Sequence, residues 1–204
     1  GVGLGTVTGT AIVGGAIGVT TAGVLEYRTL ILLNVMPMIA VGVIEEAAKL
    51  IVPALLLLVI RDRHPGDGLL VGVASGAGFA AFETMGYAFV ELVRSGGDLV
   101  AVDHLLVLRG LLSPAAHMAW TGITAAALWA AAAQGRQRHR WVKLSLAYVV
   151  AVALHTAWDS FDSDTSYIVL AVISLYLLIT AIRRLAPRSG PVKNRTFHTE
   201  GRSS

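Results

Sequence analysis

Residues 29–60 read TLILLNVMPMIAVGVIEEAAKLIVPALLLLVI, an apolar run that contains the charged residues Glu45, Glu46 and Lys49. The run is longer than the roughly 20 residues that an α-helix needs to cross the hydrocarbon core of a bilayer. Each charged residue at the middle of a spanning helix costs about 2.5 to 3.5 kcal/mol to insert. The stretch therefore predicts a membrane span that holds a polar site inside the membrane.

The apolar character extends over most of the chain. Of its 204 residues 55% are hydrophobic and only 14% are charged, a composition outside the usual range of soluble domains. Apolar stretches of spanning length lie at 4–24, 29–60, 69–94, 101–133, 142–160 and 165–185. We therefore expect an all-α, polytopic membrane bundle of about six transmembrane helices over residues 1–185, followed by a basic, disordered tail over 186–204.

The distribution of charge predicts the orientation. Basic residues gather in the loops at 61–67 and 134–143, whereas the alternating loops at 94–103 and 160–164 contain one base or none. By the positive-inside rule the basic loops and the tail face the cytoplasm of a multi-pass cell-membrane protein. Because the bases do not follow one face, we expect no binding of nucleic acid. The chain has no cysteine, which excludes disulfides, cysteine-bound metals and a cysteine nucleophile.

Ionisable residues occur in four of the predicted spans. They are Glu45, Glu46 and Lys49 in the second, Glu83 in the third, Arg109 and His117 in the fourth, and His155 and Asp159 in the fifth. Counted from the cytoplasmic ends at about 1.5 Å per residue, the Glu and His residues lie roughly 20 to 24 Å deep. This predicts one polar layer in the outer half of the membrane. The pairs Glu45–Lys49 and His155–Asp159 have the i, i+4 spacing of one helix face.

Hydrolysis of a peptide bond within the membrane suits such a layer. Adjacent carboxylates perturb each other's proton affinity, and one of them can then activate water as a general base. Imidazoles can stabilise an oxyanion or bind a metal. Adhesion between helices is a weaker explanation, because an interhelical hydrogen bond contributes less than about 2 kcal/mol. The sequence has no H-E-x-x-H, G-x-S-G or G-x-G-D motif, so a protease here must be of another kind.

In order and spacing these motifs resemble the PrsW family of bacterial intramembrane proteases. The resemblance covers roughly residues 40–160 and rests on Glu45-Glu46 with Lys49, Gly78-Phe79 with Glu83 and Tyr87, His117 with Trp120-Thr121, and His155 with Trp158. The arrangement is also similar to that of the CAAX prenyl proteases, which have a Glu pair, F-x-x-x-H and H-x-x-x-N. This chain has Glu83 and Asp159 where that pattern ends in His and Asn.

The resemblance implies regulated proteolysis of a membrane-anchored protein, such as an anti-sigma factor, near the extracytoplasmic face. Glu45 or Glu46 would activate water. His117 and His155 would either stabilise the oxyanion or bind a metal together with Glu83, and zinc accepts such nitrogen and oxygen ligands. Three further side chains complete this expected site: Asp159 would orient His155, and Lys49 and Arg109 would support the site.

Two other classes of function are compatible with the same residues. In a proton-coupled transporter the same carboxylates and histidines would form a proton relay. Inverted repeats would favour that function, but the two halves of the chain do not share their Glu or His pattern. A non-catalytic membrane scaffold would keep the fold alone, and the presence of both Glu and both His argues against it.

Small residues and prolines predict how the helices pack. Gly72, Gly76 and Ala80 lie four residues apart, a spacing that lets two helix backbones approach closely. The spacing of Thr10, Gly14 and Gly18 predicts the same for the first span. Pro37, Pro53 and Pro114 are expected to kink or break helices near the polar layer and to free backbone carbonyls.

Overall fold

A computed structural model describes residues 1–61, 63–133, 137–161 and 163–185, and over these ranges every regular element is a helix. The elements are α1 (Leu4–Gly9), the π-helix η1 (Thr10–Gly14), α2 (Gly15–Leu33), α3 (Met38–Lys49), α4 (Ile51–Val59), α5 (Pro65–Arg94), α6 (Leu99–Ala132), α7 (Arg138–Ser160) and α8 (Asp164–Leu185). The first three follow one another without a break. The predicted all-α class is confirmed, and the predicted tail at 186–204 lies outside the described residues.

Five helices of the described ranges are long and apolar enough to cross a membrane: Leu4–Leu33, Pro65–Arg94, Leu99–Ala132, Arg138–Ser160 and Asp164–Leu185. Their outward faces carry large apolar side chains such as Val93 and Leu111, which are 67% and 73% exposed. An aqueous protein would not expose so much apolar surface, whereas lipid solvates it. These findings confirm a polytopic membrane bundle.

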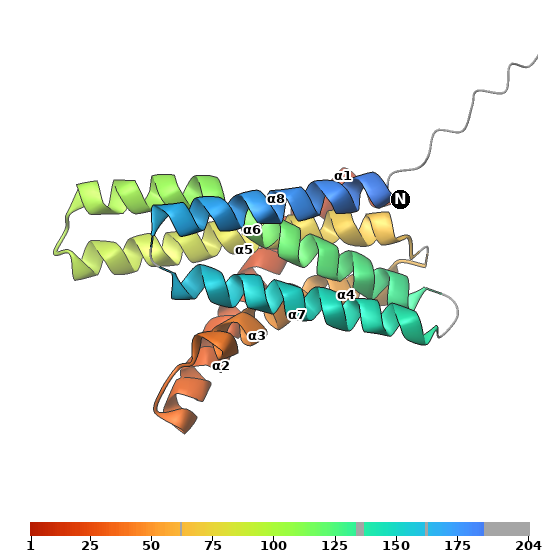
Figure 1. Ribbon diagram of the computed structural model, residues 1–204, viewed down its shortest axis with the longest axis horizontal. Helices are drawn as coiled ribbons and strands as arrows, with labels where there is room; N and C mark the ends of the chain where they lie inside the picture. Colours follow the sequence, from red (N-terminus) through yellow and green to blue (C-terminus); the bar gives the residue numbers. More distant parts are fainter. Residues whose placement is uncertain (62, 134–136, 162, 186–204) are drawn as a thin grey trace, which may run out of the picture.

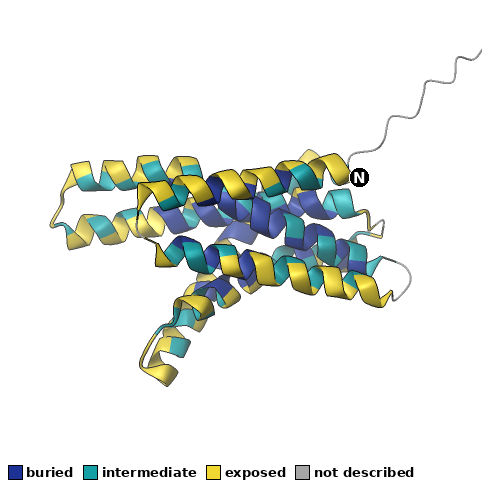
Figure 2. Cartoon of the chain, in the orientation of Figure 1, coloured by how far each residue is buried: buried dark blue, intermediate teal, exposed yellow. Residues whose placement is uncertain are grey.

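Figure 1 shows how the helices are arranged. The long helices α5, α6, α7 and α8 lie side by side, while α2 and α3 form a hairpin that leaves the bundle at an angle. Buried residues gather along α5 and α6 in the middle of the bundle, and exposed residues cover its outer faces and the tip of the hairpin (Figure 2). The core therefore centres on the α5–α6 pair.

The predicted position of the loop between the first two spans was wrong. We expected a loop at 26–28, between spans at 4–24 and 29–60, because three polar residues interrupt the apolar sequence there. Instead α2 continues to Leu33, and Asn34 ends it with a left-handed φ of 52°. The chain then turns, and α3 begins after Pro37. The helix tolerates Glu26 because this residue lines a cleft together with other carboxyl groups, described below.

The expected second span is divided at Leu50, between α3 and α4. Pro53 has no N–H and cannot donate to the carbonyl of Lys49, four residues earlier. The hydroxyl of Ser75 on α5 donates to this carbonyl instead, at 2.8 Å. The predicted effect of Pro53 is thus confirmed, and it fixes the last residue of α3 against α5.

Small residues allow α5 to lie very close to α6. A Cβ added to Gly76 would lie 2.4 Å from the carbonyl oxygen of His117, and one added to Gly72 would lie 2.6 Å from that of Thr121. Real Cβ atoms do not approach so closely, so only glycine fits at these positions. The predicted packing role of this stripe is confirmed, and it sets the distance between α5 and the helical turn that carries His117.

Candidate active site

The ammonium group of Lys49 lies at the centre of the polar cluster, and its side chain is fully buried. Its Nζ is 2.8 Å from Glu46 Oε1, 2.7 Å from His117 Nδ1 and 3.3 Å from His155 Nδ1. Its distance to Glu45 Oε2 is 3.5 Å, so the predicted i, i+4 contact is present. Lys49 thus joins three helices that are far apart in the sequence: α3, α6 and α7.

Lys49 is the last residue of α3, and two features hold it there. Its backbone carbonyl accepts the hydrogen bond of Ser75. Its ammonium lies 4.1 Å from the centroid of the Phe79 ring, a cation–π contact that contributes more in a desolvated site than in water. A cation at the C-terminus of a helix also interacts favourably with the helix dipole.

The imidazole of His155 lies near carboxylates on both of its nitrogens, and its Nδ1 is hydrogen-bonded to Glu46. Nδ1 lies 2.8 Å from Glu46 Oε1, while Nε2 lies 3.2 Å from Glu45 Oε2 and 3.3 Å from Asp159 Oδ2. Asp159 is one turn further along α7, as its spacing predicted. The ring of His155 is therefore fixed in orientation at the junction of α3 and α7.

His117 lies next to a different carboxylate, that of Glu83. A protonated Lys49 can only donate, so His117 Nδ1 accepts from it and the ring carries its proton on Nε2. This Nε2 lies 3.3 Å from Glu83 Oε2, which also accepts from Arg109 Nη2 at 2.8 Å. The guanidinium of Arg109 stacks 4.0 Å from the ring centroid of Tyr87. Arg109 thereby anchors Glu83 next to His117.

Aromatic side chains form an apolar wall against the two imidazoles. The ring of Trp120 lies 5.1 Å from that of His117 and 5.1 Å from that of His155, between ring centroids. Its Nε1 donates to Ser174 Oγ on α8 at 2.9 Å, which satisfies its polar group and fixes the ring. Trp158 packs against Trp120 at 6.3 Å and completes the wall.

The cluster carries an excess of negative charge. Its acidic side chains are Glu45, Glu46, Glu83 and Asp159, and its permanent cations are Lys49 and Arg109. A buried carboxylate is unfavourable unless it is paired. One divalent cation would balance the remaining charge.

Two groups of side chains within the described ranges could hold a metal ion. Their ligand atoms lie within 4.8 Å of one another in Glu46, His117 and His155, and likewise in Glu45, Glu83 and His155. The ammonium of Lys49 contacts all three residues of the first group, so that group already has its cation. In the second group, Glu45 Oε2 and His155 Nε2 are buried without a hydrogen-bond partner among the described residues. Neither group contains all three predicted ligands, Glu83, His117 and His155.

A cleft of about 440 Å³ between α2 and α5 reaches this cluster. Its polar lining residues are Glu26, Glu45, Glu83 and Tyr87, and its apolar ones include Val19, Phe79, Phe82 and Val90. Glu26 Oε1 is buried without a hydrogen-bond partner among the described residues. Sequence reasoning missed Glu26, because it was assigned to a loop. Its signal was present in the spacing of Gly15, Gly18, Ala22 and Glu26, which lie on one face of a helix.

The structure brings every predicted site residue into one cluster. Glu45, Glu46, Glu83, His117 and His155 are each joined to another by a contact of 3.3 Å or less, directly or through Lys49. The supporting residues Asp159 and Arg109 contact His155 and Glu83.

Comparison with known proteins adds one match. A family model described as PrsW family intramembrane metalloprotease matches residues 2–183, a range that includes the whole cluster. No curated protein and no solved structure matches the chain.

Proposed function

This chain belongs to the PrsW family of intramembrane metalloproteases, and from that premise we propose that the cleft between α2 and α5 is where it hydrolyses a membrane-anchored protein. One observation carries the proposal: the cleft reaches Glu45, whose Oε2 is buried and has no hydrogen-bond partner among the described residues. Such an oxygen is available to a water molecule in the cleft, whereas Glu46 Oε2, which also has no hydrogen-bond partner among those residues, belongs to a side chain that does not line the cleft.

This geometry favours Glu45 over Glu46 as the base. Glu46 is 1% exposed, does not line the cleft, and has Oε1 bound by both Lys49 and His155. Glu46 therefore positions Lys49 and His155. Glu45 takes a proton from water, the oxygen of that water attacks the carbonyl carbon of the substrate, and Glu45 returns the proton to the leaving amine.

His117 is placed to stabilise the negative charge that develops on the substrate carbonyl oxygen. Its Nε2 carries the proton and is buried without a well-aligned acceptor among the described residues. A donor held in this way in a water-poor site contributes several kcal/mol to an oxyanion transition state. The Lys49 contact on Nδ1 keeps the proton on Nε2.

The family description names a metal, and the second group of ligands fits one. Glu45, Glu83 and His155 offer two oxygens and one nitrogen, a donor set that zinc accepts, and their charge would be balanced by a divalent cation. These three residues would hold the ion, and Glu45 would then be a ligand of the ion instead of the base. When bound, it would polarise a water molecule or the substrate carbonyl.

The substrate is proposed to be a membrane-anchored protein, such as an anti-sigma factor, cut near the extracytoplasmic end of its span. The apolar lining of the cleft supports this class of substrate, because Val19, Phe82 and Val90 suit a lipid-embedded segment. An extended peptide also needs polar partners for its backbone within the membrane, and the carboxylates at the base of the cleft provide acceptors.

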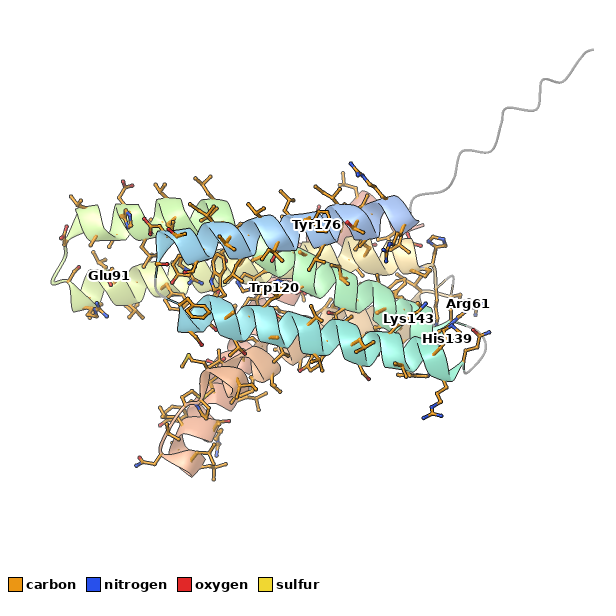
Figure 3. The ribbon with its side chains drawn as sticks, in the orientation of Figure 1. Arg61, Glu91, Trp120, His139, Lys143 and Tyr176 are labelled. Atoms are coloured by element: carbon orange, nitrogen blue, oxygen red, sulfur yellow. The ribbon has the colours of Figure 1, made fainter. Side chains whose placement is uncertain are left out.

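The experiment that tests the function compares protein N-termini in membranes that contain the native chain or Glu45→Gln. We expect new N-termini near the outer ends of substrate spans, and a loss of at least about 100-fold in their rate of formation in the variant, because a general base contributes that much. Glu91→Gln, the same change at the far end of α5, serves as control (Figure 3).

The control variant should give the native set of N-termini. Identical sets for the native chain and Glu45→Gln, with both proteins folded and present in equal amounts, would overturn the protease assignment. Measurements of proton flux would then be the next step.

A further inference from the structure

A second cavity, of about 700 Å³, lies between α6, α7 and α8 and is separate from the catalytic cluster. Its floor is apolar and is made by Ile123, Ala126, Ala127, Ala130, Leu177 and Ala181. No acidic residue lines it. An apolar space of this size between helices needs an apolar occupant, because water gains little from a surface without polar groups.

The rim of this cavity is cationic. It is formed by His139, Arg140 and Lys143 at the start of α7 and by Arg184 at the end of α8. None of these side chains makes an ion pair with an acidic group in the part of the chain that the structure describes. Arg140 Nη1 donates to the carbonyl of Ala130 at 3.1 Å, which holds its guanidinium at the cavity.

The start of α7 increases this positive potential. The first turn of the helix contains no acidic residue, and its N-cap, Gln137, makes no side-chain capping hydrogen bond. The N–H groups of a helix N-terminus attract anions, and basic side chains beside them are unfavourable unless an anion is present. The rim therefore suits a phosphate group that bears a negative charge.

The apolar floor continues toward the middle of the bundle. A smaller cavity of about 230 Å³ shares Ile123 and Leu177 with the first one and reaches Trp120 and Leu154. Figure 3 shows Trp120 near the middle of the bundle and His139 and Lys143 at its end. From Lys143 to Leu154 a helix rises roughly 17 Å, about half of the hydrocarbon thickness of a bilayer. The two cavities together form one groove, which has the depth of one leaflet.

We propose that this groove binds one anionic phospholipid from the leaflet that faces the start of α7. The phosphate lies among His139, Arg140, Lys143 and Arg184, and the acyl chains lie against α6 and α8. A soluble anion would leave the apolar floor uncovered. A peptide would bury backbone groups without hydrogen-bond partners, because the residues that line the deeper cavity are apolar. The one polar group there, the N–H of Trp120, already donates its hydrogen bond to Ser174.

The test measures lipid binding to the purified full chain by native mass spectrometry. The probes are phosphatidylglycerol and phosphatidylcholine with identical acyl chains. We expect one phosphatidylglycerol to be retained in preference to phosphatidylcholine. Lys143→Gln and Arg184→Gln should each lower that affinity roughly fivefold, on the order of 1 kcal/mol for each cation near an anionic headgroup.

Arg61→Gln is the matched control for charge. Arg61 is exposed at the same end of the bundle but does not line the cavity, so its loss should leave the affinity within about twofold (Figure 3). Ala181→Trp fills the groove and keeps all cations, and it should abolish retention. Val172→Trp, on the exposed face of the same helix, should not.

Three results would overturn the proposal. Equal retention of both lipids would mean that the groove does not recognise the headgroup. An equal loss in Arg61→Gln would mean general attraction to charge at that end. Displacement of the lipid by inorganic phosphate, together with full retention in Ala181→Trp, would mean a site for free phosphate. Thermal unfolding of each variant separates loss of binding from loss of fold, and no outcome depends on proteolysis.

Discussion

Lys49 is the residue on which the electrostatics of the candidate active site depend. Its ammonium contacts Glu46, His117 and His155 and is fully buried. A buried charge that loses its partner is more costly than the intact pair is stabilising. The acidic residues of the cluster therefore need Lys49 even before a substrate is present.

Replacement of Lys49 by Met should lower the free energy of unfolding by about 3 to 5 kcal/mol, because Glu46 loses its cation while an apolar side chain still fills the space beside Phe79. Adding Glu46→Gln should recover part of that loss, since it removes the stranded charge. Unfolding in detergent of both single variants and the double variant gives the coupling energy. Strictly additive losses would contradict the central role of this contact.

Glu26 shows that a charged residue predicted to lie in a loop can instead line a cleft. In the sequence it stands next to Tyr27 and Arg28 and has the character of a loop. In the structure it lies on α2 and lines the cleft together with Glu45 and Glu83. Its carboxyl group distinguishes the cleft from a plain lipid-facing groove.

At the scale of elements, two backbone features place the side chains of the candidate active site. The break at Leu50 ends α3 at Lys49, and Ser75 satisfies the carbonyl that Pro53 leaves free. The glycine stripe of α5 then allows α6 to bring His117 close to Lys49. These features are structural, but the geometry of the site follows from them.

Gly76→Ala tests this dependence on close packing. Its Cβ would lie 2.4 Å from the carbonyl oxygen of His117, so α5 and α6 must separate, and we expect a loss of about 1 to 3 kcal/mol in unfolding free energy together with loss of proteolysis. The matched control is Gly86→Ala on the same helix, where nothing lies within 4 Å of the added atom.

Gly86→Ala should be neutral or slightly stabilising, because Ala favours a helix by up to about 1 kcal/mol over Gly. Both variants are compared by detergent unfolding, and the N-terminus assay is applied to Gly76→Ala alone, because Gly86 lines the cleft. Equal stability of the two variants would show that the contact at Gly76 does not limit the approach of α6.

At the scale of the whole molecule, the exposed apolar belt and the uneven basic loops predict how the bundle lies in the membrane. The orientation with a cytoplasmic tail is still a prediction. The orientation decides whether the polar layer lies in the outer half of the membrane. Cleavage near the extracytoplasmic face requires the polar layer to lie there.

Cysteine labelling tests the orientation directly, because the native chain has no cysteine. Arg61 and Ser163 are exposed in loops at opposite ends of the bundle. A membrane-impermeant maleimide should label Ser163→Cys in intact cells and should label Arg61→Cys only after permeabilisation. The reverse pattern would place the tail outside and would contradict cleavage near the extracytoplasmic face.

The sequence by itself determined the membrane class, the helical fold, the family and the set of ionisable residues in the candidate site. These properties depend on local sums: hydropathy over about 20 residues, and i, i+4 spacing within one helix. The contacts Glu45–Lys49 and His155–Asp159 were predictable for this reason, and the structure has both. Family membership followed from the order of the motifs, and the family match confirms it.

Only the tertiary structure decided which of these residues meet across helices. The central position of Lys49, the pairing of Arg109 with Glu83, and the place of Glu26 in the cleft depend on how each helix is rotated and where it ends. Those quantities are set by packing between helices, here by the glycines of α5 and the break at Leu50. No local spacing encodes them, because residues on different helices approach through the whole bundle and not along the chain.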